Sequence, residues 1–155
     1  MSDLQFQRLS FSLRDVYTQP AVDLIYGSIV KGDQPDLCTA VERLAKHDVR
    51  YYGLIEDDER LVAVGSLMEA REDLGENPEW AWVEELVVDP MYRRRGLGRH
   101  LLGHLEQTAV DTLGVSAVTL YPESKVDPKV HDFYKHLGYV ACPELPMAMI
   151  KYLDD

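Results

Sequence analysis

Cysteine is scarce in this chain, with only Cys38 and Cys142 among 155 residues. Two distant cysteines predict neither a disulfide framework nor a zinc site, so we expect two buried structural thiols. Long apolar runs are also missing, and no stretch approaches the roughly 18 residues that a membrane-spanning helix needs. Residues 1–8 lack the basic start and apolar core of a signal peptide, which makes the cytoplasm the expected compartment.

Positively charged residues are also few: the chain has 16 basic and 27 acidic residues, which give a formal net charge of −11. A surface this acidic repels polyanions, so we expect no nucleic-acid partner and no membrane partner. Four of the basic residues nevertheless fall within seven positions: Arg93, Arg94, Arg95 and Arg99. Such clustering in an acidic chain indicates one local anion site.

Metal-ligand patterns are missing as well. His100 and His104 lie one helical turn apart, but no HExxH pattern or third ligand accompanies them. We therefore expect a solvated helix face there and no bound metal.

The length and composition suit one globular domain. A chain of 155 residues that is 46% hydrophobic and 28% charged can bury a continuous core without disulfides or metal. No internal repeat or linker divides it, so a single domain over residues 1–155 is expected.

Hydrophobic periodicity predicts alternating helices and strands. The expected strands are residues 5–9, 50–56, 61–70, 79–88, 115–121, 139–142 and 147–153. The expected helices are residues 14–29, with Pro20 starting or kinking the first turn, 36–46 with Asp36 as cap, 96–113 and 127–137. This order predicts a mixed α/β fold with one central strand-helix-strand crossover.

The junction between the strand at residues 79–88 and the helix at residues 96–113 has the chemistry of a phosphate site. The first amides of a helix have no intrahelical partner, and the helix dipole favours anions there. Gly96 and Gly98 lack a Cβ and so allow close approach to the backbone, while arginines add charged hydrogen bonds. A P-loop would require Gly-Lys-Ser/Thr, and a dinucleotide fingerprint would require a third glycine; both are missing.

Residues 84–99 resemble the signature region of the GNAT-type N-acetyltransferases, whose pattern Gln/Arg-x-x-Gly-x-Gly/Ala is matched by Arg93, Gly96 and Gly98. Residues 127–139 resemble the second motif of that family, a short helix ending in Phe-Tyr and followed by a Gly-aromatic pair. The resemblance covers about residues 61–139. It implies the GNAT acyl-CoA N-acyltransferase fold, with a mostly antiparallel central sheet, a splayed strand pair and flanking helices.

The resemblance also implies which residues bind acetyl-coenzyme A. The pantetheine arm would pair with the backbone of Leu86, Val87 and Val88. The pyrophosphate would be held by the basic turn, whose members are Arg93, Arg94, Arg95, Gly96, Leu97, Gly98 and Arg99. Asp127 replaces an asparagine of the family, so it can cap the helix but cannot donate an amide hydrogen bond.

Acetyl transfer to an amine needs a base, an oxyanion donor and an acid, because an alkylammonium has a pKa near 10.4. Glu84 and Glu85 alternate to opposite faces of the strand, so one of them can face the amine, and Glu85 is slightly favoured as the base. The resemblance implies that Tyr134 protonates the departing thiolate. A backbone amide near Val88 is the expected oxyanion donor.

The amine acceptor is less determined. The loop at residues 71–78, with Glu69, Glu79, Trp80 and Trp82, forms an acidic and aromatic stretch that suits a small cationic amine such as a polyamine, amino sugar or amino acid. A protein lysine or amino terminus is the second candidate, and an antibiotic is a further one. A non-catalytic acyl-CoA sensor and a nucleotide-binding domain remain open. Because relatives of this kind often dimerise, the resemblance allows a homodimer.

Overall fold

The computed structural model describes residues 3–27, 29, 31–45, 48–71, 73, 75–122 and 129–153. The chain separates into two compact units. The first unit comprises Met1–Ser66 and Glu85–Leu105, and the second comprises Leu67–Glu84 and Glu106–Asp155. Strand β3 (Arg60–Glu69) and helix α3 (Leu97–Thr108) each contribute residues to both units.

The sheet of the first unit is antiparallel where its pairings are described. Strand β1 (Leu4–Arg8) pairs with β2 (Val49–Glu56), and β5 (Leu86–Val88) pairs with β3. Strands β2 and β3 are neighbours joined by a tight turn in which Asp57 and Asp58 have φ of 53° and 61°. Aspartate tolerates this left-handed conformation better than most residues, so the two aspartates suit a turn that joins β2 and β3 as a hairpin.

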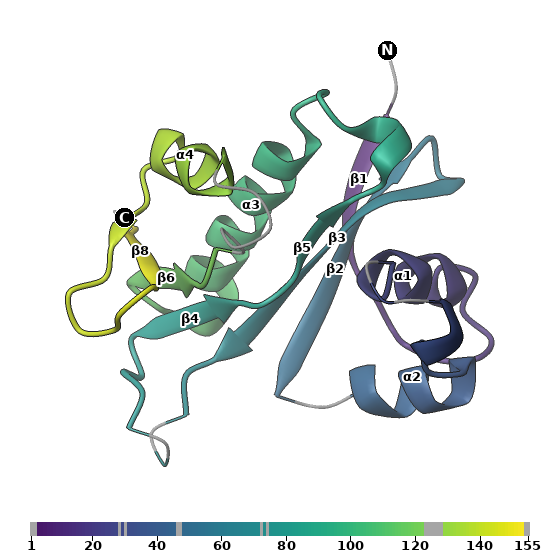
Figure 1. The fold of residues 1–155 in the computed structure, drawn as a ribbon, viewed down its shortest axis with the longest axis horizontal. Coiled ribbons are helices and arrows are strands. Elements are labelled where there is room, and N and C mark those ends of the chain that lie inside the picture. Colours follow the sequence, from purple (N-terminus) through teal and green to yellow (C-terminus); the bar gives the residue numbers. More distant parts are fainter. Residues whose placement is uncertain are drawn as a thin grey trace. The chain divides into compact units, whose positions relative to one another are not determined.

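Two helices pack on one face of this unit and lie side by side (Figure 1). They are α1 (Thr18–Ile25) and α2 (Leu37–Leu44), and together with strands β2 and β3 they enclose a core that includes Ala21, Val22, Ala40, Leu44, Ile55 and Val64. Pro20 lies in the first turn of α1 and starts the helix rather than kinking it, so α1 is shorter than predicted. The Asp36 carboxylate accepts the Thr39 N–H at 2.8 Å, which confirms the predicted cap and lowers the pKa of Asp36.

Helix α3 packs against the unit through a glycine. Successive strand residues face opposite sides, so Gly65 points away from the face that Val64 presents to α1 and α2. A Cβ at Gly65 would lie 2.7 Å from Leu105 Cδ1 and 3.2 Å from Leu101 Cδ2. The missing side chain therefore lets α3 approach β3 closely.

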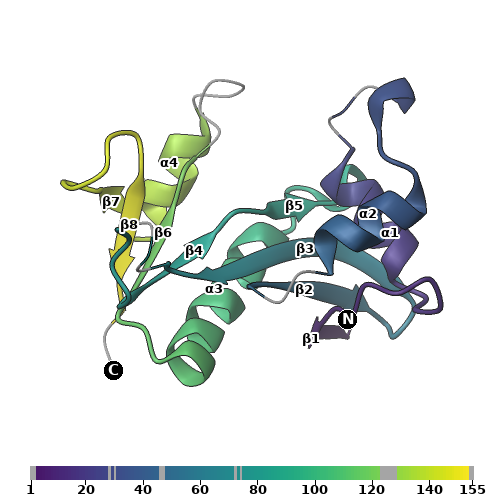
Figure 2. The same ribbon diagram turned by 90° about the horizontal axis from the view of Figure 1, so that it is seen from below.

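The sheet of the second unit contains the only parallel pair of the described pairings. Its strand order is β3-β4-β6-β8-β7, with β4 (Trp80–Val83), β6 (Ala117–Leu120), β8 (Met149–Tyr152) and β7 (Val140–Ala141). Strand β4 runs parallel to β6, and the other described pairs are antiparallel. Figure 2 shows β6 and β8 side by side. The mixed α/β fold and its strand-helix-strand crossover are as predicted.

A polar network closes the second unit. The Tyr139 hydroxyl donates to Glu106 Oε2 at 2.8 Å, and Lys151 Nζ donates to Glu106 Oε1 at 3.1 Å. Burial and the adjacent Glu106 carboxylate raise the pKa of Tyr139, so its phenol remains a donor. These contacts connect the end of α3 with β8 and with Tyr139, which lies three residues after helix α4 (Lys129–His136).

One predicted helix differs in the type of its last turn, and one predicted burial was wrong. The helix expected over residues 96–113 is α-helical only to Thr108 and finishes in a π-helical turn, Ala109–Leu113, which Gly114 ends with φ of 65°. Cys142 is buried as expected, but Cys38 is exposed because it lies on α2 away from Ala40 and Leu44, which face the core. Among the described helices, none is long and apolar enough to cross a bilayer.

Candidate active site

The strand predicted over residues 79–88 is interrupted at Glu84 and Glu85, which separate β4 from β5. Ser66 lies opposite Glu85, and Met68 lies opposite Trp82. Between these two pairs β3 has one intervening residue, whereas the β4–β5 segment has two. The β4–β5 segment therefore carries one extra residue, which is a β-bulge. The prediction of one uninterrupted strand was therefore wrong, and the alternation that assigned Glu84 and Glu85 to opposite faces does not hold across a bulge.

The register of β5 shows which of its backbone groups are available. Ser66 N–H donates to the Glu85 carbonyl at 3.0 Å, and Asp89 N–H donates to the Val62 carbonyl at 2.8 Å. Because hydrogen-bonded positions alternate in an antiparallel pair, Val87 also bonds toward β3, while Leu86 and Val88 direct their N–H and C=O groups to the opposite edge. Among the described residues, no strand pairs with that edge, so it can accept an extended ligand.

The turn after β5 has an unusual backbone. Pro90–Tyr92 form a 3₁₀ turn capped by the Asp89 carboxylate, which accepts the Met91 N–H at 2.9 Å. Arg94 and Gly96 then have φ of 68° and 74°. A glycine adopts this conformation freely, whereas an arginine does so at a cost of about 1 kcal/mol.

Helix α3 begins at Leu97, and its first internal hydrogen bond is donated by the His100 N–H to the Gly96 carbonyl at 3.0 Å. The amides of Leu97, Gly98 and Arg99 precede this bond and therefore have no intrahelical acceptor. Among the described side chains, none accepts a hydrogen bond from them. These three N–H groups can bind an anion.

The four clustered arginines are all exposed but differ in their contacts. The Arg95 guanidinium lies 4.8 Å from the centre of the Tyr92 ring and 4.0 Å from Glu56 Oε2. Within the described part of the chain, Arg93, Arg94 and Arg99 have no ion-pair partner. They are the better candidates for phosphate ligands, and Arg95 is the arginine that the protein already orients.

These features fit the phosphates and pantetheine of a coenzyme A thioester. Three helix amides without acceptors and three exposed guanidinium groups suit a pyrophosphate. The open edge of β5 suits an extended arm bearing amides, which can continue the strand ladder. Asp127 lies outside the described residues.

Tyr134 belongs to the second unit, where it is only 9% exposed on helix α4. Its ring packs edge-on against Phe133 at 5.1 Å and against Tyr139 at 5.7 Å between centroids. The Tyr139 N–H also donates to the Tyr134 carbonyl at 3.0 Å. The side chain of Tyr134 is therefore held by Tyr139, which Glu106 anchors in turn.

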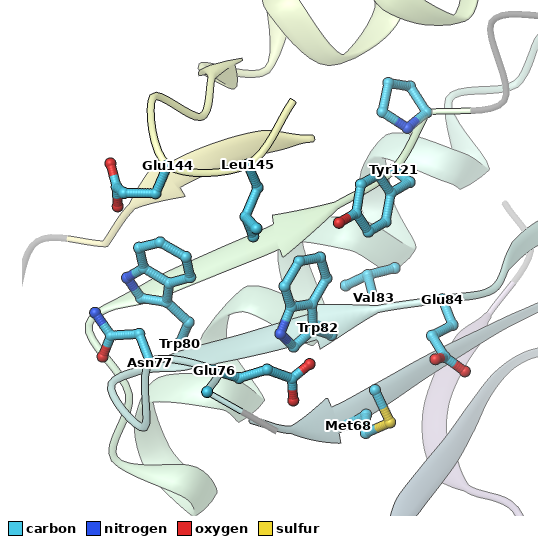
Figure 3. Close-up of a pocket in the computed structure, with 12 residues that line it drawn as sticks. Met68, Glu76, Asn77, Trp80, Trp82, Val83, Glu84, Tyr121, Glu144 and Leu145 are labelled. Carbon is cyan, nitrogen blue, oxygen red and sulfur yellow. The ribbon is translucent and has the colours of Figure 1, made fainter. Parts of the chain in front are cut away.

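A pocket of about 830 Å³ opens in the second unit beside β4 (Figure 3). Its described lining is Met68, Gly75, Glu76, Asn77, Trp80, Trp82, Val83, Glu84, Tyr121, Pro122, Glu144 and Leu145. Three of these residues are glutamates, and the described lining contains no lysine, arginine or histidine. The pocket therefore has the charge and the aromatic surface to hold a cation.

The indole of Trp82 lies in this pocket with an unsatisfied donor. Trp82 is 6% exposed and stacks on Tyr121 with ring centroids 5.3 Å apart. Its buried Nε1–H has no hydrogen-bond partner in the described part of the protein. A buried donor of this kind typically costs 1–3 kcal/mol until an acceptor reaches it.

The pocket contains some of the residues predicted for the amine acceptor and also residues that were not predicted. Trp80 and Trp82 line the pocket, whereas Glu69 and Glu79 are not among its described lining residues. Tyr121 and Glu144 were missed by sequence reasoning. The predicted strand-helix-strand crossover was the available signal for Tyr121, because a crossover of this kind makes its two strands parallel, as β4 and β6 are, and the residues that follow parallel strands meet at one edge.

Comparison with known proteins agrees with this geometry. Residues 13–139 match the model of the acetyltransferase (GNAT) family. The solved structure of a GNAT-family acetyltransferase from Staphylococcus aureus has a TM-score of 0.69 and 16% identity, over 98% of this chain and 100% of that one. The PaiA N-acetyltransferase from Thermoplasma acidophilum, solved with coenzyme A, has a TM-score of 0.66 and 14% identity, over 97% and 99%. A mutant of the spermidine N-acetyltransferase SpeG from Vibrio cholerae has a TM-score of 0.72 and 13% identity, over 96% and 93%.

The fold and the open strand edge define an acyl-CoA-dependent transferase, and the chain belongs to the acetyltransferase (GNAT) family. It is an N-acetyltransferase that uses acetyl-CoA. The resemblance recognised in residues 84–99 and 127–139 is thereby confirmed, as is the predicted fold class.

Proposed function

We propose that residues 1–155 form a single acetyltransferase domain that transfers acetyl from acetyl-CoA to a primary amine of a small cationic metabolite. The observation that carries the choice of acceptor is the pocket beside β4, whose described lining holds Glu76, Glu84 and Glu144 and no basic residue. A cationic amine is attracted by these carboxylates and by the faces of Trp80 and Trp82.

The coenzyme would be held by groups of the first unit. Its pantetheine arm would pair with the outward N–H and C=O groups of Leu86 and Val88, with Val87 keeping the strand paired to β3. Its pyrophosphate would accept hydrogen bonds from the amides of Leu97, Gly98 and Arg99 and from the side chains of Arg93, Arg94 and Arg99, with Gly96 shaping the turn and Arg95 at its edge. The thioester supplies the activated acetyl group.

The amine must lose a proton before it can attack. Glu84 is exposed and lines the pocket, whereas Glu85 is half-buried and is not among the described lining residues. We therefore favour Glu84 as the base and keep Glu85, which the sequence favoured, as the alternative. Removal of the ammonium proton frees the nitrogen lone pair for direct attack on the thioester carbonyl.

The remaining steps use a backbone amide and a phenol. As the C–N bond forms, the outward N–H of Val88 would stabilise the negative charge on the carbonyl oxygen. As the C–S bond breaks, Tyr134 would protonate the thiolate, because a phenol with an ordinary pKa of about 10 is protonated at neutral pH. The products are an acetamide and free coenzyme A.

A thiol-release assay with acetyl-CoA against a panel of amines tests this proposal. We expect turnover with small cationic amines and much weaker turnover with lysine peptides or peptide amino termini. Fastest turnover with a peptide would identify a protein acetyltransferase. Tight acetyl-CoA binding with no thiol release from any amine would instead identify a sensor module, and competition by ATP would identify a nucleotide-binding domain.

A further inference from the structure

We infer that Tyr92 is a positioning residue for the coenzyme, because two guanidinium groups on its ring hold the turn between β5 and α3 in the conformation that accepts phosphate. The guanidinium groups belong to Arg60 and Arg95, and the three side chains together are called the Tyr92 cluster. The inference rests on the proposed function, since it concerns how the proposed pyrophosphate site keeps its shape.

Arg60 connects the β2–β3 hairpin to this turn. It is the first residue of β3, and Figure 1 shows the end of the hairpin beside the turn that leads to α3. The guanidinium carbon lies 5.0 Å from the centre of the Tyr92 ring, and Nη2 lies 3.6 Å from Asp89 Oδ2 and donates to Met91 Sδ at 3.8 Å. One side chain of β3 therefore contacts three residues of the turn.

Arg95 contacts the same ring from a later position in the turn. Its guanidinium carbon lies 4.8 Å from the centre of the Tyr92 ring, and its Nη1 lies 4.0 Å from the carboxylate of Glu56 at the end of β2. Two cation–π contacts at partly exposed positions together correspond to roughly tenfold in an equilibrium constant. Within the described part of the chain the Tyr92 hydroxyl makes no hydrogen bond, so these contacts use the ring alone.

The turn needs such support because its backbone and its charges both oppose its shape. Arg94 has φ of 68°, a conformation that is unfavourable for a residue with a Cβ. The four arginines of the turn fall within seven positions and repel one another. A strained conformation persists only where surrounding contacts determine it. The Tyr92 cluster supplies such contacts from β2 and β3.

The ion pairs divide the arginines of this region into two groups. Arg60 is paired with Asp89, and both carboxylates of the cluster have side chains that are only 18% exposed. Arg95 is paired with Glu56. The other three arginines of the turn have no ion-pair partner among the described residues. The paired arginines therefore hold the turn, and the unpaired ones remain available for phosphate.

Loss of the cluster would lower the fraction of molecules whose turn is ready to bind phosphate. The apparent dissociation constant rises by the inverse of that fraction, so a turn that is competent in about one molecule in ten binds acetyl-CoA about tenfold more weakly. The pantetheine edge would keep its affinity, because β5 is held separately by the hydrogen bond from the Asp89 N–H to the Val62 carbonyl. The expected defect is therefore confined to ligands that carry phosphate.

Tyr92→Leu tests the inference, with Tyr92→Phe as the conservative variant. By calorimetry, Tyr92→Leu should bind acetyl-CoA about tenfold more weakly, whereas Tyr92→Phe keeps the ring and should stay within about twofold of the wild type. S-acetylpantetheine carries the thioester arm without the phosphates. It should bind the wild type and Tyr92→Leu equally in ligand-observed NMR, and urea unfolding verifies that both variants are folded.

Arg60→Met tests the contact from β3. We expect acetyl-CoA to bind about fivefold more weakly, and the same change should have a smaller effect in Tyr92→Leu than in the wild type, because Arg60 acts partly through the ring. Arg43→Met is the matched control, since it removes one positive charge from an exposed position of α2 and should leave the affinity unchanged.

These measurements decide the inference separately from catalysis. Wild-type acetyl-CoA affinity in Tyr92→Leu, an equal loss in Tyr92→Phe, or an equal loss of S-acetylpantetheine binding would overturn it. Equal effects of Arg60→Met and Arg43→Met would show that charge alone matters and would also overturn it. Tight acetyl-CoA binding by the wild type with no thiol release from any amine would reject acetyl transfer and leave the positioning role of Tyr92 standing.

Discussion

Ser66 and Glu85 hold each other through two hydrogen bonds. The Ser66 N–H donates to the Glu85 carbonyl at 3.0 Å, and the Glu85 N–H donates to Ser66 Oγ at 2.9 Å. In a regular antiparallel pair the second bond would go to a backbone carbonyl, so the serine side chain replaces it beside the bulge. The pair adjoins Glu84, the proposed base, and begins β5, the proposed pantetheine edge.

Replacement of Ser66 by alanine removes the acceptor of the Glu85 N–H. Because Ser66 is fully buried, we expect a loss of about 1–2 kcal/mol in the free energy of unfolding, together with a lower kcat/KM. Urea unfolding and the thiol-release assay measure the two effects. Ser116→Ala changes an exposed hydroxyl and should be close to neutral; an equally small effect at Ser66 would contradict its role at the bulge.

Gly98 tests the pyrophosphate assignment. In Gly98→Val a branched side chain stands among the amides of the first turn of α3, so we expect acetyl-CoA to bind roughly tenfold more weakly or worse by calorimetry. Gly103→Ala is the matched control, because a Cβ there has no atom within 4 Å and should stabilise the helix by about 0.5–1 kcal/mol. Normal coenzyme binding by Gly98→Val would end the assignment.

Tyr134→Phe tests the proposed proton donor. It removes one hydroxyl and keeps the ring against Phe133 and Tyr139. We expect kcat to fall roughly 100-fold with acetyl-CoA affinity nearly unchanged. Tyr152→Phe, at an exposed tyrosine, should retain wild-type kcat, and full activity of Tyr134→Phe would remove this residue from the mechanism.

His104 predicts a pH dependence of stability. Its ring stacks on Phe6 with centroids 4.6 Å apart, and its Nε2 lies 3.2 Å from His100 Nε2. Burial, followed by the nearby His100, lowers the pKa of His104 below its ordinary value near 6.5, so the folded state binds a proton less readily than the unfolded state. The neutral ring therefore contributes stability above about pH 6.5 that is lost progressively as the pH falls below it.

Urea unfolding at pH 7 and pH 5 measures this effect. The wild type should lose more stability on acidification than His104→Gln, which does not titrate in this range. An identical difference between the two pH values in both proteins would show that His104 does not contribute.

Secondary structure was predictable wherever local chemistry dominates. Asp36 caps α2, Pro20 starts α1 and Gly114 ends the helical segment after β5, because caps and turns depend on the residue itself. The break at Glu84 and Glu85 was not predictable, because residues 79–88 favour an extended chain throughout. The bulge arises from the register that β3 imposes on each side of it.

In the candidate site, too, some features could be predicted from the sequence and others could not. The turn from Arg93 to Arg99 could be recognised because its glycines and arginines are close together in the sequence. The contacts of Arg95 could not, because one of its two partners, Glu56, lies far away in the sequence. Tyr121 and Glu144 could not be assigned to the pocket from their neighbours in sequence, because one follows β6 and the other precedes β8.

The amino-acid sequence by itself determined the family and the order of most elements and predicted anion binding at the turn before α3, because these inferences follow from short-range patterns of glycine, arginine and apolar residues. The tertiary structure alone decided the open edge of β5, the separation of Glu84 from Glu144 and the unpaired indole of Trp82. Strand pairing and side-chain burial bring together residues that are far apart in the chain, and local patterns do not encode these contacts.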